Sequence, residues 1–201
     1  STYIWAVSSD AAGNAYVATG TPATVLKIAP DGKSTKLFES KNLTVQTVRV
    51  APDGAVYAAT LPSGKVYKLD PNGPVKDEGS ATVAFDPGAT EEKPKYIWDL
   101  AFDSAGRLYI ASGAPAAIYR LTPKQAAAKA ELFYKSDEQH IRCLAFDRDG
   151  NLIAGSDGDG LVYRIDPAGK AFVVYDAPKR EITSVAIGDS GAIYAAAVGD
   201  K

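Results

Sequence analysis

The chain has 201 residues, of which 46% are apolar and 23% charged, a balance typical of a folded protein and not of a disordered segment. Its 22 basic and 24 acidic residues leave a formal charge of −2, which argues against a nucleic-acid surface because phosphate binding needs clustered excess Lys and Arg. The apolar stretches are far shorter than the roughly 20 residues of a membrane helix, so no membrane span is predicted.

A five-fold repeat organises the sequence. In each copy an apolar run leads into a turn with Asp and Gly and then a second apolar run, and the copies begin at Val7, Val48, Leu100, Leu144 and Val185. Successive copies start 41, 52, 44 and 41 residues apart. A period in the low forties with about four strand signals is typical of a β-propeller blade. The longest spacing indicates an insertion, which we place at residues 86–95.

Each repeat is predicted to contain four strands, A to D, in chain order. Strands A and B form a hairpin whose glycine supplies the positive φ that tight turns need. Strand C recurs at 25–28, 66–69, 118–121 and 162–165, and a turn with proline follows each copy. Strand D is clearest at 35–38, 131–134 and 171–175, and helical periodicity is confined to a short turn at 125–130.

The predicted fold is an all-β propeller segment with four complete four-stranded antiparallel blades and strands A and B of a fifth. We expect one segment over residues 1–201, with blades at about 3–40, 44–86, 96–136 and 140–176 and a partial blade at 181–198. The sequence has no methionine and begins with Ser1, so we do not expect Ser1 to be the translation start. Together with the half blade, this predicts an arc of a larger, six- to eight-bladed propeller.

An arc of this kind is expected to have two open ends. Apolar columns there lack an in-chain neighbour on one side, namely Ile4, Val7 and Tyr16 at one end and Ile182, Val185 and Tyr194 at the other. Apolar faces of that size seldom stay bare, and an open edge strand is a template for strand addition. The expected partners are therefore the remaining propeller blades, a second polypeptide or another copy of the chain. The alternative is a tight four- or five-bladed closure.

Residues 102–111, with the sequence Phe-Asp-Ser-Ala-Gly-Arg-Leu-Tyr-Ile-Ala, resemble the blade signature of NHL-repeat propellers. Gluconolactonase-like and streptogramin-lyase-like propellers share this signature, and the resemblance extends over the whole chain. WD-repeat proteins are a poorer match because no Trp-Asp closes strand C. The resemblance implies the fold, whereas function has to be argued from a site, because this fold carries unrelated activities.

The start of strand A is the expected binding mouth, because strand A lines the central channel of propellers. Aromatic and polar side chains flank the apolar column there: Tyr3, Trp5, Gln46, Tyr96, Trp98, His140, Arg142 and Glu181. Such a set can stack on a flat ligand or a sugar. The alternative is that the aromatic side chains pack between neighbouring blades and the charged ones are solvated. A basic column in strand C (Lys27, Lys68, Arg120 and Arg164) is expected to be solvated or to pair with acidic neighbours.

Three further features bear on chemistry. His140 is the only histidine, so we expect a hydrogen-bonded loop residue, with a catalytic acid or base as the alternative. Cys143 is the only cysteine, which excludes an internal disulfide and predicts a buried, inert thiol. Asp157 and Asp159 lie in a B–C loop and are weak candidates for calcium, and no other cofactor is predicted.

The preferred function is a non-catalytic binding or interaction module that presents its strand-A mouth and its D–A and B–C loops to a protein, glycan or small ligand. The alternative is a metal-dependent lactonase or hydrolase, or a lyase, of the gluconolactonase or streptogramin-lyase kind. The resemblance implies Glu, Asn and Asp metal ligands for the lactonases, and here only Asp99 and Glu181 stand at comparable positions. Such an active site would need blades absent from this chain. The single Cys, the Asp/Gly/Ala-rich turns and the NHL-like blades predict an exported protein, extracellular or periplasmic.

Overall fold

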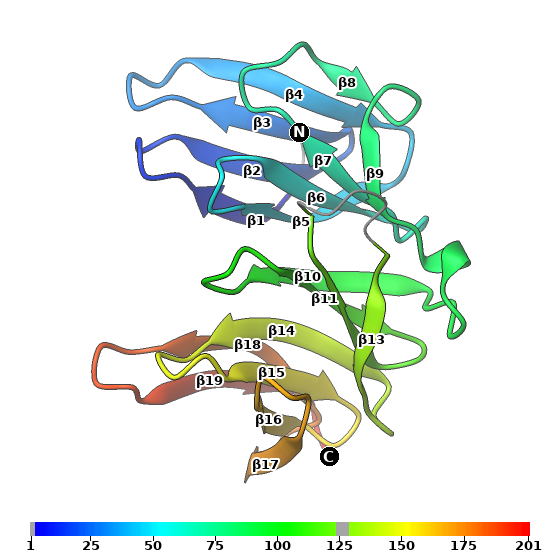
Figure 1. Ribbon diagram of the computed structural model, residues 1–201, viewed down its shortest axis with the longest axis vertical. Helices are drawn as coiled ribbons and strands as arrows, with labels where there is room; N and C mark the ends of the chain where they lie inside the picture. Colours follow the sequence, from blue (N-terminus) through cyan, green and yellow to red (C-terminus); the bar gives the residue numbers. More distant parts are fainter. Residues whose placement is uncertain (1–2, 124–128) are drawn as a thin grey trace. The chain divides into compact units, whose positions relative to one another are not determined.

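The computed structural model describes residues 3–123 and 129–201, which form strands joined by short turns (Figure 1). Strands make up 56% of the residues and helices 2%, which confirms the predicted all-β class. In the described part, the helical segment is the 3₁₀ turn η1 (Pro87–Ala89), and no helix is long and apolar enough to cross a membrane. The turn predicted at 125–130 lies mostly outside the described residues. The chain forms two compact units, Ser1–Ile97 and Trp98–Lys201.

The first unit contains two antiparallel groups of blade type and one added strand. In chain order the first group is β1 (Tyr3–Ser9), β2 (Ala15–Gly20), β3 (Ala23–Ile28) and β4 (Ser34–Ser40). The second is β5 (Thr44–Val50), β6 (Val56–Leu61), β7 (Val66–Leu69) and β9 (Thr82–Phe85). The added strand, β8 (Lys76–Asp77), pairs with β4 in parallel.

The second unit repeats this pattern. Its first group is β10 (Tyr96–Phe102), β11 (Leu108–Gly113), β12 (Ala117–Leu121) and β13 (Glu131–Lys135). The next group is β14 (His140–Phe146), β15 (Leu152–Asp157), β16 (Leu161–Ile165) and β17 (Ala171–Asp176). A two-stranded pair follows, β18 (Glu181–Ile187) and β19 (Ile193–Val198).

The A–B hairpins are closed by an aspartate and a glycine. In the turn between β10 and β11, Asp103 Oδ1 accepts the backbone N–H groups of Ala105 and Arg107 at 3.0 and 2.8 Å. Gly106 there has a φ of +79°, a left-handed conformation that other residues adopt only at a cost. The same positive φ occurs at the turn glycines of the other four repeats: Gly13, Gly54, Gly150 and Gly191. The recurring Asp/Gly phrase is therefore a turn signal.

A β-bulge lies near the start of strand A. In β14, Ile141 pairs with Ser156 and Cys143 with Gly155, so Arg142 is an extra residue on that strand. The same shift occurs in β1, β5 and β18. Directly paired residues lie on one face of a sheet, so the bulge brings the side chains of Ile141 and Leu144 onto the same face. Both side chains are buried in one core cluster.

Apolar clusters fill the spaces between neighbouring groups of strands within a unit, and three of them are described by their residues. One joins β2–β4 to β5–β7 and includes Tyr16, Phe38, Val48 and Tyr67. Another joins β11–β12 to β14–β16, with Tyr109 and Leu144 inside. The third lies between β14–β16 and β18 and includes Ile153 and Ile182. Both predicted core columns (Tyr57, Tyr109 and Ile153; Val48, Leu100 and Leu144) are buried.

The prediction for the open ends was wrong for two of its residues. Tyr16 and Ile182 are buried, whereas Ile4, Val7 and Tyr194 are more than half exposed. The reason is that the two columns face opposite sides of a blade. The Tyr16 column faces the following group of strands, and the Ile4 column faces the preceding one. The first and the last group of strands therefore each expose one of their two apolar columns and bury the other.

The insertion in the second repeat is divided between two places. Residues 86–95 contain η1 and the loop leading to β10, as predicted. The connection from β7 to β9 is also long, and it contains β8. Its two residues pair with β4 as Phe38 with Lys76 and Glu39 with Asp77. A two-residue strand lacks a periodic pattern, which is why the sequence did not reveal β8.

We predict that Leu144→Ala lowers the free energy of unfolding by about 2–5 kcal/mol, because a buried leucine is replaced by a cavity. Leu144 is 6% exposed and packs in the cluster with Ile141 and Tyr109. The measurement is urea unfolding followed by circular dichroism. Leu132→Ala is the control, because Leu132 is 43% exposed and should cost less than about 1 kcal/mol. If the two variants lost equal amounts of unfolding free energy, the result would contradict the strand register that buries Leu144.

Candidate functional site

The structure distributes the predicted mouth residues over both units. Tyr3, Trp5 and Gln46 lie in the first unit, and Tyr96 lies near its end. The remaining four, Trp98, His140, Arg142 and Glu181, come from the starts of β10, β14 and β18 in the second unit. These four are linked into one set by the contacts described below. They form the candidate site.

Trp98 and His140 are joined across neighbouring strands. The Trp98 indole Nε1–H donates to His140 Nδ1 at 3.1 Å, and the two rings meet edge to face with centroids 5.5 Å apart. An indole N–H can only donate, so Nδ1 is the acceptor and the neutral imidazole carries its proton on Nε2. The contact fixes both the orientation and the tautomer of His140.

Arg142 extends the linked set toward β18. Its guanidinium carbon lies 3.8 Å from the centre of the Trp98 ring, a cation–π contact. Arg142 Nε donates to Glu181 Oε1 at 2.7 Å, and both side chains are about three-quarters buried. The guanidinium is thus held on one side by a ring and on another by a carboxylate. Because Arg142 is the bulged residue of β14, its side chain departs from the alternation of the strand.

The pKa of His140 is lowered from its ordinary value of 6.5, chiefly by burial, which disfavours the charged imidazolium. The cations of Arg142 and Arg180 act in the same direction, while the carboxylates of Asp157 and Glu181 oppose it. The net effect is a neutral His140 at neutral pH. This protonation state is the one that the Trp98 hydrogen bond requires.

The two weak calcium candidates, Asp157 and Asp159, contact different residues. Asp157 Oδ1 lies 3.3 Å from Arg180 Nε, an ion pair at the surface. The side chain of Asp159 is exposed, and its backbone N–H donates to Glu138 Oε2 at 2.7 Å. Across residues 3–123 and 129–201, no group of three or more His, Cys, Asp and Glu side chains is placed to hold a metal ion.

Asp99 and Cys143 occupy one column of strand A and contact the next strand A. Asp99 is buried, and its Oδ2 accepts the backbone N–H of Leu144 at 3.0 Å, so β10 is fastened to β14. Cys143 Sγ lies 3.6 Å from the carbonyl oxygen of Ile182 in β18. Burial raises the pKa of the Cys143 thiol to about 12, which fits the inert thiol predicted from the sequence. The bridging role of Asp99 was not predicted.

Gly113 allows the Trp98–His140 contact. It pairs with His140 at the end of β11, and a Cβ there would lie 1.8 Å from His140 Nδ1 and 2.6 Å from Trp98 Nε1. Gly20 has the same relation to Trp5 in the first unit, with a Cβ-to-Nε1 distance of 2.7 Å. Each tryptophan therefore lies in a repeat whose strand B ends in glycine. This occurrence of tryptophan together with glycine is visible in the sequence, but the predictions above did not use it.

The corresponding residues of the first unit are more open. Tyr3 and Trp5 are exposed, with ring centroids 6.1 Å apart. Thr44 of β5 occupies the position that His140 has in β14. Its hydroxyl group donates to the carbonyl oxygen of the next residue, Val45, at 3.1 Å. Gln46 is half-buried at the bulge of β5. This edge lacks the linked arginine and glutamate of the second unit.

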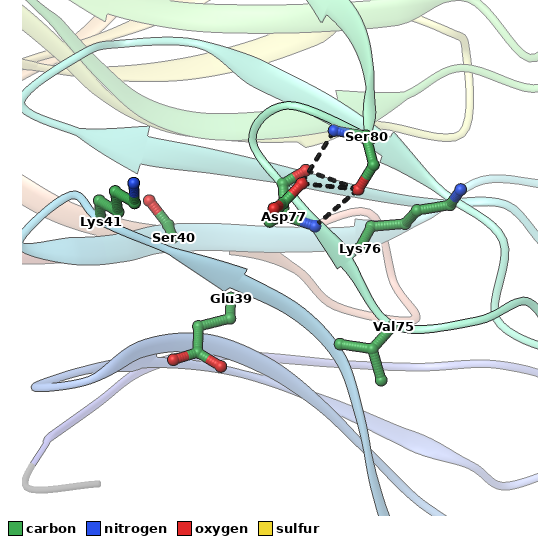
Figure 2. A pocket seen from close by; sticks show the side chains of 7 residues that line it. All are labelled: Glu39, Ser40, Lys41, Val75, Lys76, Asp77 and Ser80. Carbon is green, nitrogen blue, oxygen red and sulfur yellow. Dashed lines mark hydrogen bonds between the residues drawn. The ribbon is translucent and has the colours of Figure 1, made fainter.

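A surface hollow of about 430 Å³ lies beside β4 and β8 in the first unit (Figure 2). Its lining is Glu39, Ser40, Lys41, Val75, Lys76, Asp77 and Ser80. Asp77 is turned onto Ser80, whose hydroxyl donates to Asp77 Oδ1 at 2.7 Å (Figure 2). The lining has two acidic and two basic side chains, so it carries no net charge that would select an ionic ligand. None of the predicted site residues lies there.

Comparison with known sequences gives one short match. The family described as WD domain, G-beta repeat matches residues 132–164, a stretch that begins in β13 and ends in β16. It is shorter than one repeat of this chain and agrees with the repeat architecture. No curated protein sequence matches the chain significantly.

Comparison with solved structures gives propellers. Virginiamycin B lyase from Staphylococcus aureus superimposes with a TM-score of 0.78 and 14% identity over 98% of this chain and 64% of the lyase. A streptogramin B lyase gives 0.80 and 16% over 96% and 62%. A gluconolactonase from Xanthomonas campestris gives 0.74 and 16% over 96% and 68%. The chain spans less than two thirds of either lyase. These likenesses place the fold with the streptogramin-lyase and gluconolactonase propellers, as the sequence resemblance implied.

We predict that Gly113→Ala breaks the Trp98–His140 contact and lowers the free energy of unfolding by about 1–3 kcal/mol, because the new methyl group overlaps both ring nitrogens. Thermal unfolding and near-UV circular dichroism report the loss. Gly79→Ala is the matched control, since its Cβ would find only Asp77 Oδ1 at 3.6 Å. A Gly113→Ala protein as stable as Gly79→Ala would refute the close approach.

We predict that the fluorescence of Trp98 falls on acidification with a midpoint below pH 6.5, the ordinary pKa of histidine. Protonation of Nδ1 removes the acceptor of the indole N–H, and an imidazolium beside an indole quenches it. The folded state favours neutral His140, so its contribution to stability is present above pH 6.5 and is lost as pH falls through the lowered pKa. Measurement uses a Trp5→Phe background, which leaves Trp98 as the only tryptophan. His140→Gln should abolish the transition, and its persistence would assign it to another group.

Proposed function

We propose that the chain is a ligand-binding β-propeller segment and that Trp98, His140, Arg142 and Glu181 bind a neutral, oxygen-rich small ligand such as a saccharide. The observation that carries this proposal is the fixed guanidinium of Arg142. It lies 3.8 Å from the Trp98 ring centre and is bonded to Glu181, so little side-chain entropy is lost when a ligand binds to it.

The donor geometry supports an oxygen-bearing ligand. The Nε of Arg142 is used by Glu181, which leaves the two terminal amino groups of the guanidinium to donate to ligand oxygens. The side chain is 25% exposed, so these groups are accessible in part and are partly shielded from competing water. Hydroxyl and carbonyl oxygens are suitable acceptors for such a donor pair.

The charge balance supports a neutral ligand over an anion. Arg142 is paired with Glu181, and Arg180 is paired with Asp157 on the neighbouring strand end. The two cations are thus matched by two carboxylates, and His140 is neutral at neutral pH. An anionic ligand would gain little net attraction and would compete with Glu181 for Arg142. The remaining mode of recognition is a neutral ligand that is oriented by hydrogen bonds and packs on an aromatic surface.

The enzyme alternative is favoured by one observation, the likeness of the fold to lyase and gluconolactonase propellers. At 14–16% identity this likeness concerns the fold alone. His140 is the residue that would act as acid or base, and its Nδ1 accepts from Trp98. Hydrolysis of simple lactones, with and without added calcium, tests this alternative directly. Turnover that disappears in His140→Ala would replace the binding proposal.

The binding test follows Trp98 fluorescence in the Trp5→Phe protein while a panel of neutral oligosaccharides is titrated. We expect saturable quenching by at least one member, with no chemical change of the ligand. Arg142→Gln should weaken that affinity by roughly tenfold or more, because it removes the charged donor. Arg148→Gln makes the same change at an arginine that is 66% exposed and should leave the affinity unchanged. Absence of saturable binding, or equal losses in both variants, would refute the site.

A further inference from the structure

Aromatic contacts between strand D of one blade and strand C of the next recur in the chain. In the first unit, the ring of Phe38 in β4 lies 5.0 Å from that of Tyr67 in β7. In the second, Tyr134 in β13 lies 5.6 Å from Tyr163 in β16. Phe38 and Tyr134 hold equivalent places, because each pairs with the strand-C residue just before a register shift. The contact is therefore a feature of the blade interface.

A hydrogen bond to the next blade recurs at the same interface. Lys27 Nζ in β3 donates to the carbonyl oxygen of Pro71, in the turn after β7, at 3.3 Å. A guanidinium nitrogen of Arg120 in β12 donates to the carbonyl oxygen of Pro167, in the turn after β16, also at 3.3 Å. A basic residue of strand C thus binds the proline turn that follows strand C of the next blade.

The blade made of β14–β17 has both groups without their partners. Tyr175 pairs with Val162 before the register shift, so it is the equivalent of Phe38 and Tyr134, yet it is 55% exposed. Arg164 holds the place of Lys27 and Arg120. Its Nε is buried and faces Asp147 Oδ2 of its own blade at 3.4 Å. The contact of Arg120 with the next blade is made by a terminal guanidinium nitrogen, and the Arg164 side chain, 43% exposed, can offer the equivalent donor to a partner.

The neighbouring strand edge is open as well. In residues 3–123 and 129–201, β19 pairs with β18 alone, whereas β15, its equivalent, pairs with both β14 and β16. In that pairing Tyr163 of β16 lies opposite Ala154 of β15. By the repeat, the equivalent position on β19 is Ala195. Unpaired backbone groups on an edge strand favour addition of a further strand.

We infer that the surface formed by Arg164, Tyr175 and the open edge of β19 binds a β-hairpin with the sequence character of this chain's own C–D hairpins. Its first strand carries the pattern Val-Tyr-Lys/Arg-Leu/Ile and pairs antiparallel with β19, with the tyrosine opposite Ala195. That tyrosine packs on Tyr175. The carbonyl of the proline turn that follows accepts a hydrogen bond from Arg164.

A second folded copy of the chain does not fit this surface. Its hairpins of this type contain β3, β7, β12 and β16, and each of these strands is already paired with a strand B of its own blade. Docking one of them on β19 would break that pairing and leave buried backbone groups unsatisfied. The partner is therefore a hairpin that has not yet been incorporated into a blade.

The test is isothermal titration calorimetry of the 201-residue chain with a synthetic peptide that copies residues 161–176. We expect saturable one-to-one binding and a higher melting temperature of the complex. Tyr175→Ala and Arg164→Met should each weaken binding by roughly tenfold, because each removes one recurring contact. A peptide that carries Tyr163→Ala should bind the wild-type chain with an affinity reduced by a similar factor. This peptide lacks the ring that packs on Tyr175 of the protein, so it should bind the wild-type chain and the Tyr175→Ala chain equally.

Val173→Ala is the matched control. Val173 lies on the same strand as Tyr175 and is 51% exposed, but it pairs with Tyr163 and therefore lies on the opposite face of the sheet. Its truncation should change the affinity by less than about twofold. The proposal is overturned if the peptide shows no saturable binding at millimolar concentration, or if Val173→Ala and Tyr175→Ala weaken it equally. Self-association of the chain, measured by light scattering and abolished by Tyr175→Ala, would instead assign the surface to a second copy.

Discussion

The extra residue in strand A controls both the packing of the blades and the geometry of the candidate site. Without it, Ile141 and Leu144 would face opposite sides of their sheet, and one of them would leave the cluster that fills the space next to β11 and β12. With the extra residue present, the side chains of Ile141 and Leu144 lie on the same face of the sheet. Arg142, the extra residue, does not follow the alternation of side chains between the two faces. The same device recurs in β1, β5 and β18, so one local distortion, repeated, sets the orientation of every side chain that follows it.

The candidate site combines this distortion with two close approaches. Gly113 removes the side chain that would separate Trp98 from His140, and Asp99 fastens β10 to β14 one position farther along. The aromatic ring, the imidazole and the guanidinium are therefore positioned by backbone features of three adjacent strands. A site of this kind depends little on loop conformation, which suits a binding surface that has to be preorganised.

Much of the fold could be predicted because the repeat makes each position appear several times. The Asp/Gly turns, the strand order and the buried columns all follow from comparing copies, and Arg120 pairs with Glu131 across strands as the basic column suggested. What the comparison could not give is the direction in which a column faces, since Tyr16 and Ile4 look equally apolar in the sequence. The Trp98–His140 link was not predicted, although the glycine at the end of strand B in both repeats with tryptophan is a signal for it. The two-residue β8 carries no pattern at all.

That small parallel strand has a kinetic consequence. The hairpins of the first unit close over short turns, whereas β8 reaches β4 from far along the chain, and Ser40 and Glu78, which bond beside it, are 38 positions apart. The chain entropy lost on closing such a loop has to be met by contacts that exist only once both flanking blades are formed. The β8 segment therefore docks late in folding and is among the first parts to open, so exchange of its amide hydrogens with solvent will be faster than in the strands it covers.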